Sequence, residues 1–150
     1  MNIEIREATD ADLPDVLDLY AQPGLDDGQV LSLEDARQLL AQFARYPNYR
    51  LFVACDLDHG GAVVGSYALL VMHNLAHCGT PSAIAEDVVV HPLRQGHGIG
   101  RRMMARAVEQ ARQAGCYKLA LSSNQKRRQA HAFYESLGFQ RHGLSFVIET

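Results

Sequence analysis

The stretch Val88-Val89-Val90-His91-Pro92-Leu93-Arg94-Gln95-Gly96-His97-Gly98-Ile99-Gly100 decides the fold of this chain. Its three valines predict the end of a buried strand, and the proline and glycines that follow predict a loop. A helix is predicted next, from about Gly98 to Ala114. The first N–H groups of a helix have no partner within it, and the helix dipole favours a negative charge beside them. The stretch therefore predicts an anion site, or else a turn whose glycines only allow tight packing.

Working outward, hydrophobic spacing and turn residues predict one α/β domain over residues 1–150. The expected strands are Ile3–Arg6, Tyr49–Asp56, Ala62–Leu75, Ala83–Val90, Lys118–Leu121 and one or two strands from Phe139 onward. The expected helices are Asp10–Ala21, Ser32–Tyr46, Gly98–Ala114 and Arg127–Leu137. Short turns join the strands Tyr49–Asp56, Ala62–Leu75 and Ala83–Val90, which predicts an antiparallel meander.

A second informative segment is His131-Ala132-Phe133-Tyr134-Glu135-Ser136-Leu137-Gly138-Phe139. Its apolar residues recur at helical spacing, and Gly138 is the expected residue for a left-handed helix end. On this pattern alone, Tyr134 is a half-buried core aromatic.

Together, the two segments resemble the signatures of the GNAT superfamily of N-acetyltransferases. Gln95-x-x-Gly98-x-Gly100 is similar to the family's pyrophosphate loop, and Phe133-Tyr134-Glu135-x-x-Gly138-Phe139 is similar to its second signature. The order of elements matches over nearly the whole chain. The resemblance implies a single GNAT-like domain with a mixed, mostly antiparallel sheet and helices on both faces. It also implies that the strands ending near Val90 and Leu121 splay apart to admit the coenzyme.

The resemblance implies acetyl-coenzyme A as co-substrate and assigns residues to it. The pantetheine arm is expected along the strand end, and the pyrophosphate on the loop. The expected coenzyme contacts are Val88, Val89, Val90, Gln95, Gly96, His97, Gly98, Ile99, Gly100, Arg101 and Asn124. Arg94, Arg101 and Arg102 flank the loop and can add charge-assisted hydrogen bonds. Arg127 stands where many relatives have asparagine, which leaves its role open.

Acyl transfer to an amine needs a base for the amine, a donor for the oxyanion and an acid for the leaving sulfur. A phenol and a thiol have pKa values of ~10 and ~8.5, so Tyr134 is a suitable acid, as the resemblance also implies. Backbone N–H groups of the strand end are candidate oxyanion donors. Glu86, acting through water, is the expected base, with Asp87 as the alternative. The two carboxylates point to opposite faces if their strand is regular.

The acceptor is expected to be a small cationic amine, attracted by Asp26 and Asp27 in the loop Gln22–Val30. A solvated acidic loop without a role is the alternative, as is a protein or peptide acceptor. A sensor that binds coenzyme A without turnover lies outside the enzyme class, and Tyr134 argues against it, since a binder needs no acid.

The composition limits which other ligands and partners are expected. The chain has 14 basic and 17 acidic residues, so no net positive charge favours nucleic acid or an anionic membrane. Three dispersed cysteines and seven histidines form no zinc-like spacing, so no metal is expected. Without a signal-like segment or a long apolar run, the chain is expected to be cytoplasmic. Family resemblance implies a homodimer.

Overall fold

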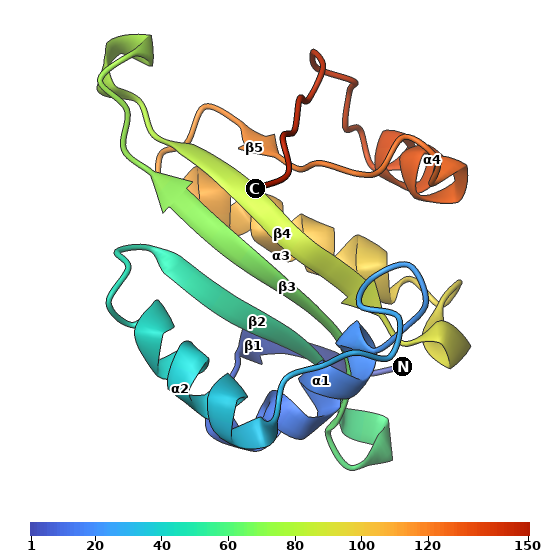
Figure 1. The fold of residues 1–150 in the computed structure, drawn as a ribbon. Coiled ribbons are helices and arrows are strands. Elements are labelled where there is room, and N and C mark those ends of the chain that lie inside the picture. Colours follow the sequence, from blue (N-terminus) through green and yellow to red (C-terminus); the bar gives the residue numbers. More distant parts are fainter. The chain divides into compact units, whose positions relative to one another are not determined.

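The computed structural model describes residues 1–150, which form two compact units, Met1–Ala120 and Leu121–Thr150. The first unit contains a five-stranded sheet with three α-helices, and the second contains α4 (Arg128–Ser136) (Figure 1). None of the helices combines the length and apolar character needed to cross a membrane.

The sheet of the first unit has the strand order β1-β2-β3-β4-β5. The strands are β1 (Ile3–Glu7), β2 (Tyr49–Asp56), β3 (Ala62–Met72), β4 (Ser82–Val90) and β5 (Leu119–Ala120). Neighbours pair antiparallel from β1 to β4, whereas β5 runs parallel to β4. The expected meander and the mixed, mostly antiparallel sheet are therefore confirmed.

β5 pairs with β4 only at Ala83 and Ile84, at the start of β4. No strand of the first unit pairs with Val88–Val90 on that side. This half of the β4 edge is thus open in the first unit. The family resemblance implied that the strands ending near Val90 and Leu121 splay apart here.

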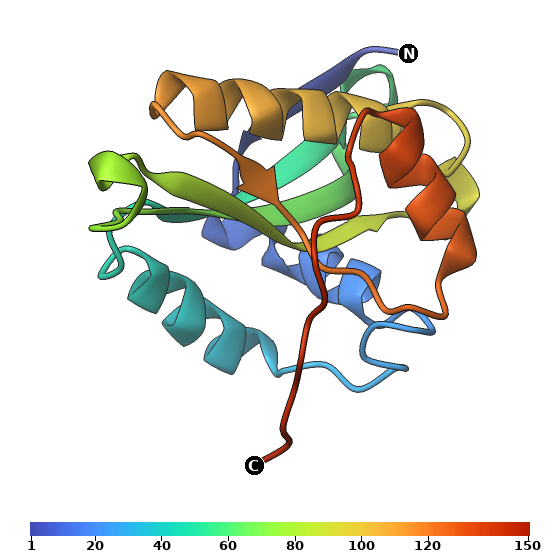
Figure 2. The same cartoon turned by 90° about the horizontal axis from the view of Figure 1, so that it is seen from above.

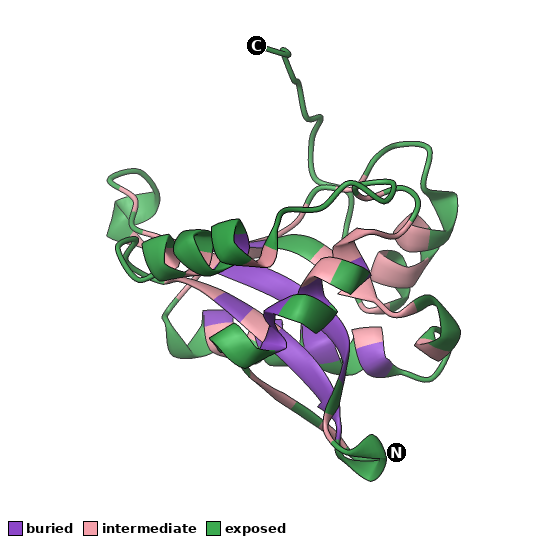
Figure 3. Cartoon of the chain, turned by 60° about the horizontal axis from the view of Figure 1, so that its bottom comes forward, coloured by how far each residue is buried: buried purple, intermediate pink, exposed green.

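Helices cover both faces of the sheet. α3 (Ile99–Gln113) lies on one face, and α1 (Leu13–Tyr20) and α2 (Leu33–Phe43) lie on the other (Figure 2). α3 turns a stripe of buried residues to the sheet, namely Ile99, Met103, Met104, Ala107 and Ala111. On the other face, Val16 and Leu19 pack against Leu51, Val53 and Ala68. The central strands are accordingly buried, while the outer sides of the helices are exposed (Figure 3).

β4 is not a regular strand, because it carries a bulge in front of its last residues. Ser66 of β3 pairs with Val89 and Ala68 pairs with Glu86, so Tyr67 alone stands opposite both Asp87 and Val88. Asp87 takes the extra residue's strained geometry, with φ of 51°, in the left-handed region. The condition under which Glu86 and Asp87 would point to opposite faces is therefore not met.

Two expectations about strands are wrong. β3 ends at Met72 rather than Leu75, because Asn74 Nδ2 donates to the Thr80 carbonyl at 2.8 Å and closes a loop there. No strand forms after Phe139. The apolar residues of that segment, Leu144, Phe146, Val147 and Ile148, are all more than 80% exposed. A strand needs a neighbour for its backbone hydrogen bonds, and the second unit contains no other strand.

Candidate active site

The loop before α3 is built on two glycines with positive φ. Gly96 has φ of 78° and Gly98, the N-cap of α3, has φ of 81°. Side chains other than glycine's adopt this region at a cost, which explains the residue type. A Cβ at either position would meet no atom within 4 Å. The space beside the loop is therefore open, as close approach of a ligand to the backbone requires.

Backbone donors face this open space. The first helical hydrogen bond of α3 runs from Arg102 N–H to the Gly98 carbonyl at 3.1 Å. The N–H groups from Gly98 to Arg101 have no acceptor in the protein. Ile99 contributes only its amide, because its side chain is 1% exposed and packs against β3 near Gly65. Arg101 and Arg102 are exposed beside these donors, so the helix start presents four amides and two cations to an anion.

Gln95 closes the loop onto the end of β4. The His91 N–H donates to the Val64 carbonyl of β3 at 2.8 Å, so the Val90 carbonyl of the same trans peptide points to the opposite, open edge. That carbonyl accepts hydrogen bonds from the Gln95 amide at 3.3 Å and from the Gln22 amide at 3.4 Å. Gln95 thus holds the end of β4. The family resemblance assigned this strand end to the coenzyme.

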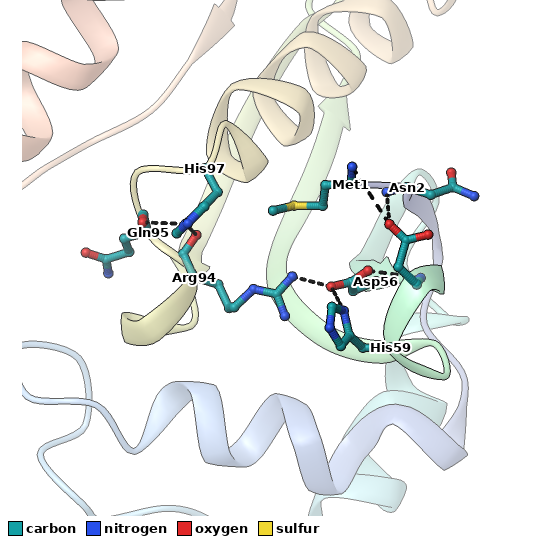
Figure 4. A network of polar contacts seen from close by, with 8 residues as sticks. Met1, Asn2, Asp56, His59, Arg94, Gln95 and His97 are labelled. Atoms are coloured by element: carbon teal, nitrogen blue, oxygen red, sulfur yellow. Dashed lines mark hydrogen bonds and ion pairs between the residues drawn. The ribbon is translucent and has the colours of Figure 1, made fainter.

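Arg94 does not face the loop's open side. Its guanidinium forms an ion pair with Asp56, which is fully buried at the end of β2 (Figure 4). Of the three arginines that flank the loop, only Arg101 and Arg102 keep their charges free for an anion. His97 also turns back, with its Nδ1 2.9 Å from the Gln95 carbonyl oxygen.

The bulge brings both carboxylates of β4 to the face covered by α1 and α2. Glu86 lies opposite Ala68, whose side chain belongs to the core on that face, and directly opposed residues share a face. Burial raises the pKa of the Tyr20 and Tyr49 phenols. The charge of Asp87, which lies near both rings, raises the pKa further. Both tyrosines pack against the same core. The two carboxylates were expected on opposite faces only if the strand were regular, and the bulge makes it irregular.

Asp87 has an unusual electrostatic environment. It keeps contact with solvent, yet desolvation by the surrounding protein, followed by the charge of Asp26, raises the pKa of its carboxyl above the usual aspartate value. Asp26 lies in the loop after α1, and the Gln22 contact places that loop beside the end of β4. Asp27 differs, because its Oδ1 accepts from the Gly24 N–H at 2.8 Å within the loop. Of the two expected acceptor contacts, Asp26 is the one whose charge acts on Asp87.

Tyr134 and Asn124 belong to the second unit. Tyr134 lies on α4 between Phe133 and Phe139, with ring centroids 5.2 and 5.7 Å away. Burial raises the pKa of its phenol, while the charge of Arg127 opposes that rise, so the group stays protonated at neutral pH. Asn124 Oδ1 accepts from the Lys126 N–H at 2.9 Å, ahead of α4. This contact lies in the segment that leads into α4.

Sequence reasoning missed three groups. Asp56 and Tyr20 carry no motif, and only the folded chain brings them to Arg94 and Asp87. Ser123 is the third, since its hydroxyl is buried without a hydrogen-bond partner. No group of three His, Cys, Asp or Glu side chains able to hold a metal ion is present.

Comparison with known proteins adds independent information. The model of the acetyltransferase (GNAT) family matches residues 13–139. A glucosamine 6-phosphate N-acetyltransferase of Trypanosoma brucei brucei is 30% identical, covering 95% of this chain and 92% of its own. An aminoglycoside N(6')-acetyltransferase type 1 of Stenotrophomonas maltophilia is 35% identical, covering 91% and 85% respectively. A solved structure from Agrobacterium tumefaciens str. C58 is 34% identical, with a TM-score of 0.89 and coverage of 98% and 99%.

Proposed function

The chain belongs to the acetyltransferase (GNAT) family, and on that premise we propose that it moves an acetyl group from acetyl-coenzyme A to the primary amine of a small molecule. Its relatives are named as N-acetyltransferases of an amino sugar phosphate and of aminoglycosides, which makes this chain an acyltransferase and supports a small acceptor.

One observation carries the proposal: the unpaired amides from Gly98 to Arg101 open onto free space beside Gly96 and Gly98. The pyrophosphate of the coenzyme fits such a donor set, because the N–H groups are fixed in place and no Cβ blocks the approach. Arg101 and Arg102 would add charge to the same side. The open edge of β4 at Val88–Val90 offers backbone groups to the pantetheine arm.

The proposed acceptor site follows from the carboxylates on the face of the sheet that α1 and α2 cover. Glu86 and Asp87 lie at the bulge of β4, and the charge of Asp26 acts on Asp87, so these carboxylates favour a cationic amine there. An ammonium bound between Asp26 and Asp87 would relieve their mutual repulsion. Two acidic groups in one place therefore suit an amino sugar better than a neutral acceptor.

The chemical roles are assigned to two residues. Glu86 accepts the proton of the amine through a water molecule, and Asp87 at the same bulge is the alternative base. Tyr134, with its pKa raised by burial, holds the proton that the departing sulfur needs. Backbone N–H groups of the Val88–Val90 segment are the candidate donors to the oxyanion.

The proposal is tested by measuring thiol release from acetyl-coenzyme A with a panel of amines. The panel contains amino sugars, aminoglycosides, simple diamines, and peptides with free N-termini or lysines. We expect turnover with cationic small amines and little with peptides. Exclusive turnover of peptides would replace the acceptor class, and coenzyme binding without turnover of any amine would favour a sensor.

A further inference from the structure

An ion pair between a buried carboxylate and a partly exposed arginine links the coenzyme loop to a distant strand end. Asp56 closes β2 and is 0% exposed, and its carboxylate pairs with Arg94, 38 residues away in the sequence. His59 Nδ1 lies 2.7 Å from the same carboxylate, and the Asp58 N–H donates to it at 3.1 Å. Figure 4 shows Arg94 reaching across from the loop to this cluster. Asp56 therefore has three partners, and only Arg94 comes from outside its own turn.

Arg94 is the last residue of the turn Pro92–Arg94, and the loop Gln95–Gly98 follows at once. The turn is fixed at its start, where the His91 N–H donates to β3. The ion pair fixes its end. Beyond it, the residues from Gln95 to Gly98 are exposed and are held by hydrogen bonds of the Gln95 and His97 side chains. The pair is thus the charged anchor of a loop that has few other contacts.

We propose that Asp56 and Arg94 are positioning residues for the coenzyme: their ion pair presets the loop Gln95–Gly98 and the start of α3 for the pyrophosphate without touching it. This inference rests on the proposed use of acetyl-coenzyme A. The Asp56 carboxylate is fully buried and Arg94 is partly exposed. Burying the carboxylate costs desolvation that its attraction to the guanidinium only roughly offsets, so such a pair specifies one conformation more than it stabilises the fold. A loop that is already in place binds its ligand without first paying for its ordering.

A single substitution separates this role from direct phosphate binding by Arg94. Asp56→Asn keeps the shape of the side chain and its contact with the Asp58 N–H, and it releases the guanidinium from its partner. If Arg94 were a phosphate ligand held back by Asp56, the variant would bind acetyl-coenzyme A more tightly. If the pair positions the loop, the variant binds it more weakly.

The size of the effect depends on how often the released loop takes the competent geometry. An apparent Kd rises in inverse proportion to that fraction, so a loop that is competent a tenth of the time gives a rise of about tenfold. We expect this rise in the Kd by calorimetry and in the KM for acetyl-coenzyme A. The kcat at saturating coenzyme and the KM for the amine should stay close to the parent's, which a general loss of stability would not produce.

The chain offers a matched control in its other buried aspartate. Arg6 pairs with Asp12, which is 6% exposed, through two hydrogen bonds of 2.7 and 2.9 Å between β1 and the start of α1. Asp12→Asn removes the same kind of ion pair at a place unconnected with the loop. It should lower the denaturation midpoint and leave the Kd for acetyl-coenzyme A unchanged.

Calorimetry on the parent protein comes first, because a parent that does not bind acetyl-coenzyme A refutes the proposed function and not the anchor. If the parent binds, an Asp56→Asn variant with equal or tighter affinity overturns the positioning role. Should that variant fold poorly, Arg94→Gln removes the charge from the other end of the pair, while Asp56 keeps its contacts with His59 and the Asp58 N–H. A folded Arg94→Gln variant with the parent's affinity would overturn the proposal equally.

Discussion

Gly65 of β3 offers a direct test of how α3 is seated on the sheet. A Cβ at this position would lie 2.6 Å from Met103 Sδ, 3.1 Å from the Val89 carbonyl oxygen and 3.5 Å from Ile99 Cγ2. The Met103 side chain is flexible but fully buried, and the Val89 oxygen belongs to the backbone of the paired strand. Gly65→Ala therefore needs movement of the first turns of α3 or of the bulged end of β4.

Two effects of opposite sign meet at this position. Replacing glycine by alanine in an unstrained strand stabilises by about 0.4–1 kcal/mol, because the unfolded chain loses freedom. Overpacking a close-packed core costs roughly 1–3 kcal/mol. With one contact at 2.6 Å and another to backbone, we expect overpacking to win, with a net loss of about 0.5–2 kcal/mol.

Urea denaturation measures this loss as a lower midpoint at an unchanged slope. The same variant should bind acetyl-coenzyme A more weakly, because Ile99 and Met103 seat the turn that carries the unpaired amides. Met103→Ala makes a cavity and should cost about 2–5 kcal/mol alone, but less beside the new methyl of Ala at position 65. A coupling of about 1 kcal/mol or more between the two changes is expected. A stabilised Gly65→Ala, or strict additivity, would refute this account of the packing.

Three further predictions concern the chemistry. Tyr134→Phe should lower the single-turnover rate by about 10²–10⁴-fold and leave the Kd for acetyl-coenzyme A unchanged; a rate equal to the parent's excludes the acid role. Glu86→Gln should lower the rate at every pH, and the loss should be largest at low pH, where little free amine exists. If Asp87→Asn shows that pH dependence instead, the base is Asp87. Asp26→Asn should lower the pKa of Asp87, because a neighbouring negative charge is removed, and should raise the KM for cationic amines. Asp27→Asn is its control, since asparagine can still accept from the Gly24 N–H; equal effects would contradict the assignment.

Much of the fold follows from the sequence because its signals are local. Ser32 predicts the start of α2, and its Oγ accepts from the Asp35 N–H at 3.1 Å. Gly138 predicts the end of α4, and its φ of 93° is left-handed. The segment after Phe139 shows the limit of such reasoning. Its β-forming composition is real, but a strand exists only beside another strand, and composition does not name a partner.

The coenzyme loop was also accessible from the sequence, because glycines and a helix start are neighbours in the chain. Its arginines were not, since a sequence shows where a charge lies but not where the side chain points. Arg94 stands one residue before Gln95, yet its partner is the buried Asp56 at the end of β2. The loop's attraction for an anion therefore comes from the amides of Gly98–Arg101 together with Arg101 and Arg102.

The bulge at Asp87 has the same origin and a larger consequence. Alternation along a strand assigns faces only while every residue is paired, and one extra residue shifts all that follow. Here it places Val89 on the face of Glu86, and it leaves Asp87 with positive φ, a state that aspartate tolerates better than the valines around it. A regular strand would have turned one of the two carboxylates toward α3. The strained residue instead gathers the acidic groups on the side of α1, where we propose that the amine binds.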